Sequence, residues 1–154
     1  MQITMTGEYA IRAMIHLAAP RDNKPAQIAE ISQAWDIPES FLRKIITQLG
    51  KAHLVTSQRG IGGGVQLARP ANELTIMDVL YAVEGPMFLN KCLINASVCG
   101  RTSWCAVHDL WFDAQEKLKA SLTSRTLADL AETSLQSRSR KESAPILPEG
   151  ISVI

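Results

Sequence analysis

The spacing of hydrophobic positions predicts a mainly helical chain. Apolar residues recur every three or four positions, as on one face of a helix, in six stretches. These stretches cover about 6–19, 26–35, the residues that follow Pro38, 75–83, 107–122 and 126–132. Two short apolar runs, 54–58 and 65–68, flank a glycine-rich tip at 60–64, and together they predict a β-hairpin.

The order of these elements predicts a winged helix-turn-helix. The second and third helices are joined by the short connection "WDIPES", and the hairpin follows the third helix directly. A nucleotide-binding loop is a poor alternative for the glycines, because "RGIGGGV" lacks both the Lys-Ser/Thr ending and the following helix. The expected fold class is mainly α with a small β-hairpin wing: a winged helix-turn-helix DNA-binding domain plus a long C-terminal dimerisation helix.

The chain divides into four predicted segments. Residues 1–85 form the winged helix-turn-helix domain, and residues 86–106 form a loop that contains every cysteine. Residues 107–132 form the dimerisation helix and a short final helix, whereas 133–154, rich in polar residues, is expected to be a weakly ordered tail. The apolar stripe of the long helix needs a partner surface, and we expect the same helix of a second subunit, as in a homodimer.

Composition places the chain among globular proteins and reveals one basic segment. The 154 residues are 46% hydrophobic and 20% charged, and the N-terminal helix is interrupted by charges, so a cytoplasmic protein without a signal peptide or membrane span is expected. The net charge of +1 hides the stretch between Ser40 and Asn72, which has no acidic residue. A basic patch of this kind is typical of a polyanion-binding surface.

Three groups of residues are candidates for contact with double-stranded promoter DNA. The N-terminal half of the third helix would enter the major groove, the hairpin would reach the minor groove, and the start of the first helix would contact phosphates. Phe41 either contacts a thymine methyl group or fills the core. The predicted set is Ser40, Phe41, Arg43, Lys44, Arg59, Gly62, Gly63, Thr4 and Tyr9.

The chain's three cysteines indicate metal ligation or redox chemistry. Cys92, Cys99 and Cys105 lie within one loop, and His108 follows the last of them by three positions. An odd number of thiols cannot all pair within one chain. A structural zinc ion is a weaker alternative, since zinc ligands come in pairs two to four residues apart and no such cysteine pair is present. Nothing in the loop suggests catalysis by an activated cysteine.

Several motifs in the same order resemble the Rrf2 family of bacterial winged-helix regulators, which includes IscR, NsrR and RirA. They are "TGEYAIRAMIHLA", "IPESFLRKIITQLGKAHLVTSQRGIGGGVQLARP", "LTIMDVLYAVEG", the three cysteines, "CAVHDLW" and "TLADL". The resemblance covers the chain to about Glu132. It implies a homodimeric repressor, neither an enzyme nor a binder of small-molecule substrates. Such a repressor couples an iron-sulfur cluster to promoter binding and senses iron, redox state or nitric oxide.

The resemblance also implies that a fourth ligand joins the three cysteines. His108 matches the histidine that binds a two-iron cluster in some members, and Glu8 matches an acidic residue that reaches a four-iron cluster of the partner subunit in others. We favour His108 and [2Fe-2S] over [4Fe-4S], and keep Glu8 as the second candidate. Two function classes remain. The first is a DNA-binding regulator, which senses either through a cluster or, as a cluster-free or zinc-binding protein, through thiol chemistry. The second is a metal protein that acts through protein partners or electron transfer.

Overall fold

The described part of the chain is mainly helical and contains one hairpin. The computed structural model describes residues 3–20, 24–60 and 62–143. Its elements in chain order are α1 (Met5–Ala18), α2 (Ile28–Trp35), α3 (Glu39–Lys51), β1 (Val55–Gln58), β2 (Gly64–Leu67), η1 (Ala71–Glu73), α4 (Ile76–Glu84), η2 (Lys91–Leu93), η3 (Ala96–Val98), α5 (Ala106–Thr123) and α6 (Leu127–Ser143).

The core is built on α1. Its residues Ala10, Ala13 and Met14 are fully buried, and α3, α4 and α6 pack against this helix. Gly7 allows α4 to approach closely, because a Cβ atom at this position would lie 3.0 Å from Leu80 Cδ2. The small residues of α1 therefore allow α3, α4 and α6 to pack closely around this helix.

The turn between α2 and α3 is stabilised by a left-handed backbone conformation, by one buried side chain and by one hydrogen bond. Asp36 adopts the left-handed conformation with φ 52°, which ends α2, and Ile37 is 1% exposed. The Ser32 hydroxyl donates a hydrogen bond to the Ile37 carbonyl at 2.6 Å. This turn orients α3 so that its apolar face is buried and its polar face is exposed: Leu42, Ile45, Ile46 and Leu49 lie in the core.

The hairpin predicted from the sequence is present as an antiparallel pair. Val55 pairs with Leu67 and Gln58 pairs with Gly64, so the tip spans residues 59–63. The positive φ angles of Gly60 and Gly62, 98° and 79°, are ones that side-chain-bearing residues rarely adopt. The fold class, mainly helical with a small hairpin wing, is confirmed.

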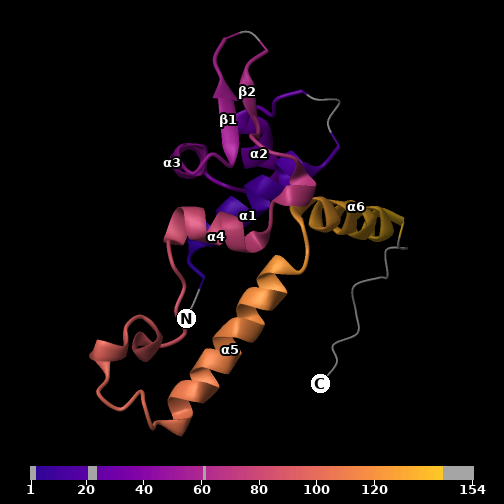
Figure 1. Cartoon of the computed structure of the whole chain (residues 1–154). Coiled ribbons are helices and arrows are strands. Elements are labelled where there is room, and N and C mark those ends of the chain that lie inside the picture. The colour runs from indigo at the N-terminus through magenta and orange to yellow at the C-terminus, as the bar shows by residue number, and fades with distance from the viewer. Residues whose placement is uncertain (1–2, 21–23, 61, 144–154) are drawn as a thin grey trace, which may run out of the picture.

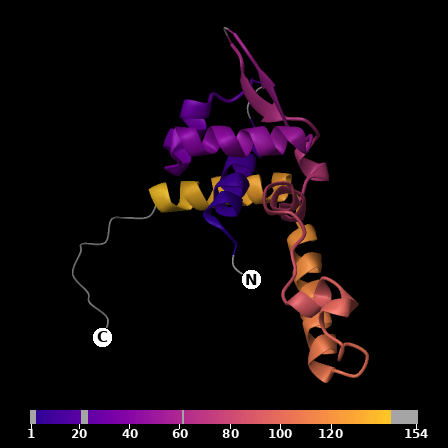
Figure 2. The ribbon, with the colours of Figure 1, turned by 90° about the vertical axis from the view of Figure 1, so that its left-hand side faces the viewer.

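Helix α5 extends away from the body on the side opposite to the hairpin (Figure 1). The loop that joins α4 to α5 folds back beside the far end of this helix, and the turned view shows the same arrangement (Figure 2). The body and the projecting helix are thus spatially distinct. The role of α5 in dimerisation stays a prediction.

Helix α6 is longer than the sequence predicted. It continues to Ser143, whereas composition predicted a short helix to Glu132 and a weakly ordered tail from residue 133. The physical reason is tertiary contact: α6 packs on α1, and Arg138 lies over the ring of Trp35. Residues 144–154 of the predicted tail lie outside the described residues.

Candidate DNA-binding surface and cysteine loop

The exposed face of α3 carries three of the predicted DNA contacts. Ser40, Arg43 and Lys44 are all exposed. The Arg43 guanidinium pairs with the Glu39 carboxylate one turn earlier, at 2.9 Å. This pair is exposed and therefore weak, so Arg43 can exchange its carboxylate partner for a base edge or a phosphate.

Phe41 and Tyr9 lie against each other between α3 and α1. Their rings meet edge to face, with centroids 5.7 Å apart and planes at 83°. The Arg12 guanidinium lies 5.8 Å from the centre of the Tyr9 ring. Both rings are half-buried, so the structure places Phe41 in a packing contact, one of the two roles expected for it.

Thr4 uses its polar atoms within the chain. Its hydroxyl oxygen accepts hydrogen bonds from the N–H groups of Thr6 and Gly7, which caps α1. Its own N–H and hydroxyl donate to Glu84 Oε1, each at 2.9 Å. The start of α1 is thereby joined to the end of α4. Phosphate contact by Thr4 and Tyr9 stays a prediction.

The hairpin and α3 border one hollow, which we call the wing groove. It has a volume of about 380 Å³, and both Arg43 and Arg59 line it. Gly63, a buried residue, also lines the groove, and a Cβ atom at this position would overlap the Gln58 carbonyl oxygen. Gly62, the residue before Gly63 in the chain, is exposed. The structure thus brings the predicted cations of the helix and the hairpin to one place.

The cysteine loop, residues 86–106, distributes its thiols along its whole length. Cys92 lies in η2, Cys99 follows η3, and Cys105 is the N-cap residue of α5. All three thiols are free and partly exposed. The His108 N–H donates to the Cys105 carbonyl at 2.9 Å, so these two residues share the first turn of α5.

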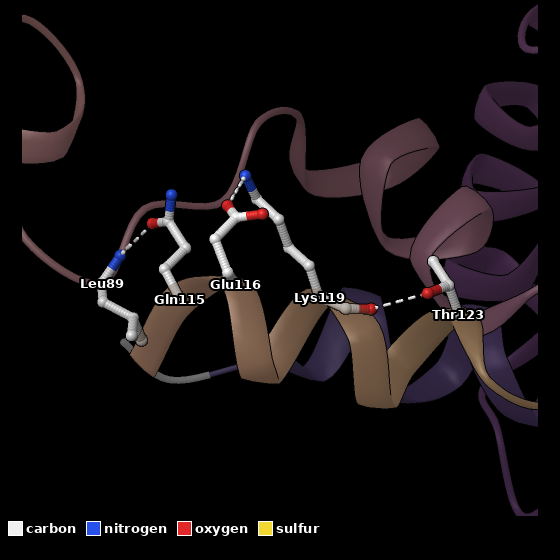
Figure 3. Close-up of polar contacts among 5 residues, drawn as sticks. All are labelled: Leu89, Gln115, Glu116, Lys119 and Thr123. Atoms are coloured by element: carbon white, nitrogen blue, oxygen red, sulfur yellow. Dashed lines mark hydrogen bonds and ion pairs between the residues drawn. The ribbon is translucent and has the colours of Figure 1, made fainter. Parts of the chain in front are cut away.

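One buried amide joins the loop to α5. The Leu89 N–H donates to Gln115 Oε1 at 3.1 Å (Figure 3), and the Gln115 side chain is 5% exposed. Gln115 lies two helical turns after His108, so both side chains share one face of α5. His108 therefore faces the loop. The sequence analysis missed Gln115, although it is a polar residue within a predicted apolar stripe.

The predicted ligands supply suitable donors, but the described conformation does not gather them. Among the described residues, no three His, Cys, Asp or Glu side chains are grouped closely enough to hold a metal ion. Glu8 lies on α1 and pairs with Arg12 at 2.8 Å. The buried His108 Nδ1 has no hydrogen-bond partner in the described part of the chain. Three thiols and an unsatisfied imidazole fit an iron-sulfur cluster chemically, provided that the loop moves.

Much of the apolar surface of α5 is exposed. Val107, Leu110 and Phe112 are 54%, 63% and 53% exposed, and Trp104 in the adjoining loop is 72% exposed. Val107 and Leu110 lie one turn apart on one face of the helix, and exposed apolar neighbours of this kind are typical of a surface that another protein covers. None of the described helices is both long and apolar enough to cross a membrane.

Comparison with known proteins identifies the family. The sequence profile of the Rrf2 family, described as an iron-dependent transcriptional regulator, matches residues 3–133. The chain belongs to the Rrf2 family. The transcriptional regulator IscR of Photobacterium profundum is 35% identical to this Rrf2 protein over 130 residues, which are 84% of this chain and 75% of that one.

Solved structures of Rrf2 relatives have the same architecture. The structure of CymR (YrzC), the global cysteine regulator of B. subtilis, has a TM-score of 0.72 at 29% identity and covers 86% of this chain and 98% of that chain. T. potens IscR has a TM-score of 0.68 at 24% identity, with coverage of 97% and 94%, and supports the fold alone. The expected regulatory, non-enzymatic function is confirmed at the level of the Rrf2 family.

Proposed function

We propose that this Rrf2 protein is a homodimeric repressor of promoter DNA that responds to the state of an iron-sulfur cluster. The cluster ligands are Cys92, Cys99, Cys105 and His108. The observation that carries the proposal is the buried Nδ1 of His108, which lacks a hydrogen-bond partner among the described residues and lies one turn from Cys105. A buried polar atom without a partner is costly, and ligation removes that cost.

Thiolates and an imidazole suit this type of cofactor. Cys92 and Cys99 lie in the loop while Cys105 and His108 lie at the start of α5, so ligation by all four joins the loop to the helix. A bound cluster supplies a redox-active centre that reacts with oxidants, with a potential set by ligand type and solvent exposure. Replacement of Cys ligands by His raises that potential in other two-iron centres.

The apolar face of α5 supports a homodimer. Burying Val107, Leu110 and Trp111, which lie on one side of the helix, against the same residues of a second chain removes exposed apolar surface from water. A twofold axis then presents two copies of α3 and of the wing groove to two half-sites of a duplex. The spacing between these copies depends on how the two α5 helices pair.

A chain of contacts connects the ligands to the DNA-binding surface. The loop is tied to α5 through Leu89 and Gln115, and α5 leads into α6, whose N–H at Leu127 donates to the Leu74 carbonyl at 2.8 Å. Helix α6 packs on α1. Ligation of Cys92 and Cys99 beside Cys105 and His108 would rearrange the loop on α5, which would change the α5 pairing and the placement of the two DNA-binding domains.

The test is an anaerobic purification followed by iron and sulfide analysis and an absorption spectrum. The wild type should carry iron and acid-labile sulfide with visible absorption, and Cys99→Ala should lose them. His108→Ala should alter the spectrum while Glu8→Ala leaves it unchanged; the reverse result would assign the fourth position to Glu8. Asp109→Asn, next to His108 and exposed, is the matched control.

A cluster-free function is the second candidate, because the three thiols are free and ungrouped in the described conformation. A colourless wild type with about one zinc, or with no metal, would support sensing by thiol chemistry instead. DNA binding is tested separately with duplexes selected from a random library. A salt-dependent, sequence-specific affinity is expected of a regulator, and its absence would favour action through protein partners or electron transfer.

A further inference from the structure

The segment that leads into α2 runs beside the hairpin. Ala26 and Val65 exchange two backbone hydrogen bonds, each 2.8 Å long, so residue 26 adds a short bridge to the edge of β2. Gly64 makes this approach possible, because a Cβ atom there would lie 2.6 Å from the Ala26 carbonyl oxygen. The base of the hairpin is thus attached to the helix-turn-helix directly before α2 begins.

The next residue, Gln27, makes a second attachment nearer the tip. Its side-chain Nε2 donates a hydrogen bond to the Gly63 carbonyl. Gln27 is the N-cap residue of α2, yet its side chain makes no capping hydrogen bond. The Gly63 N–H in turn donates to the Gly60 carbonyl at 3.0 Å, which closes the tip turn. A single amide therefore connects the start of α2 to that turn.

The wing groove lies at this attachment. Its lining includes Gln27 together with Arg43 of α3 and Arg59 of the hairpin, and none of the described residues that line it carries a carboxylate. Arg43 lies on α3, whose apolar face is packed in the core, whereas Arg59 directly follows β1 at the tip of a two-stranded hairpin. The placement of Arg59 relative to Arg43 depends on what holds the tip.

We propose that Gln27 is a positioning residue for DNA binding. By holding the Gly63 carbonyl, it keeps the hairpin at a fixed distance from α3, so that Arg59 and Arg43 engage one duplex together. Preorganisation of this kind raises affinity because less freedom is lost on binding. The inference rests on the proposed function as a DNA-binding protein, and it concerns a residue outside the predicted set of DNA contacts.

A double-mutant cycle separates positioning from direct contact. Gln27→Met keeps the length of the side chain and removes the donor, and Gln27 is exposed, so the fold should persist. We expect Gln27→Met to weaken binding to a selected duplex about three- to tenfold, the range for one lost hydrogen bond. In an Arg59→Ala background the same substitution should have almost no effect, because the residue that it positions is gone.

Salt dependence gives a second readout. Exchange of one neutral side chain for another removes no charge, so a purely structural change leaves the salt slope of the affinity as it was. If Gln27→Met displaces Arg59 from the duplex, the slope should fall by up to about 0.9, the value for one neutralised phosphate. Gln66→Ala, on β2 but outside the wing groove, is the matched control.

The outcomes are distinct. Additive effects of Gln27→Met and Arg59→Ala, or an unchanged affinity in Gln27→Met, would overturn the positioning role while leaving DNA binding intact. A wild-type protein without sequence-specific affinity would overturn the proposed function and this inference with it. If Gln27→Met loses helical circular dichroism, Gln27→Leu, which is also neutral and cannot donate to the carbonyl, replaces it in the cycle with the same expected coupling.

Discussion

The guanidinium of Arg138 lies over the indole ring of Trp35, with its central carbon 4.7 Å from the ring centre. Trp35 Nε1 in turn donates to His16 Nδ1 at 3.3 Å. These contacts join α6, α2 and α1, so the last described helix reaches the helix-turn-helix. A segment with the composition of a disordered tail is therefore part of the body of the protein.

Removing the guanidinium should loosen the end of α6. A cation over an aromatic ring at a partly exposed site contributes about 0.5–1 kcal/mol, so Arg138→Ala should lower the free energy of unfolding by about that amount. Amide hydrogen exchange should accelerate in the last turns of α6. Arg140→Ala, an exposed substitution two residues later, is the control, and equal effects of both would show that the ring contact is unimportant.

A methyl group at position 7 should be destabilising. The Cβ of Gly7→Ala would overlap Glu84 Oε1 and press against Leu80, so the Glu84 carboxylate and the buried Leu80 side chain must shift. We expect a loss of about 1–3 kcal/mol in chemical denaturation, as for an overpacked core. Gly50→Ala in α3 has only one backbone atom within 4 Å, at 3.9 Å, and should be neutral or stabilising.

Arg43 should contribute directly to affinity for DNA. Arg43→Ala should weaken binding to a selected duplex by about 1–3 kcal/mol if it reads a base, and lower the salt slope if it binds phosphate. Glu39→Gln, which removes its partner in the helix, should strengthen binding modestly. Titrations by fluorescence anisotropy at several salt concentrations measure both. Lys119→Ala on α5 is the control, and a loss of equal size there would argue against a local contact.

The start of α6 should respond to acid. Hydrogen bonds from the backbone N–H of Thr126, and then from its hydroxyl, hold the pKa of Asp129 below its ordinary value of 3.8. A lowered pKa means that this carboxylate stabilises the fold above about pH 3.8, and that its contribution is lost as the pH falls through the lower folded value. Thermal unfolding followed from neutral pH into acid should be less pH-dependent in Asp129→Asn. If Asp113→Asn reduced the pH dependence of unfolding equally, the effect would come from the loss of a negative charge in general and not from the Thr126 hydrogen bonds.

A charge on the apolar face of α5 should separate the proposed dimer. Leu110→Glu places a carboxylate at a position that is 63% exposed in the single chain, so the monomer should still fold. Sedimentation should then show a monomer, whereas Ala120→Glu, an exposed position on another face of α5, should stay dimeric. A dimer that survives Leu110→Glu would place the interface elsewhere.

Local patterns in the sequence determined most of the elements. The repeat of apolar residues predicted α1, α2, α4 and α5 to within two residues at each end and placed α3 after Pro38. The two apolar runs around glycines predicted the hairpin. The basic stretch of α3 and the hairpin was equally visible, because charge is a property of each residue. These features depend on neighbours in the chain, and sequence reasoning can reach them.

Only the tertiary structure decided the features that join distant residues. Arg138 near the end of α6 meets Trp35, about a hundred positions earlier in the chain, and Gln27 meets Gly63 of the hairpin. The three cysteines are close in sequence, yet the described loop does not gather them. Sequence spacing limits how far apart residues can lie, whereas packing decides which of them meet.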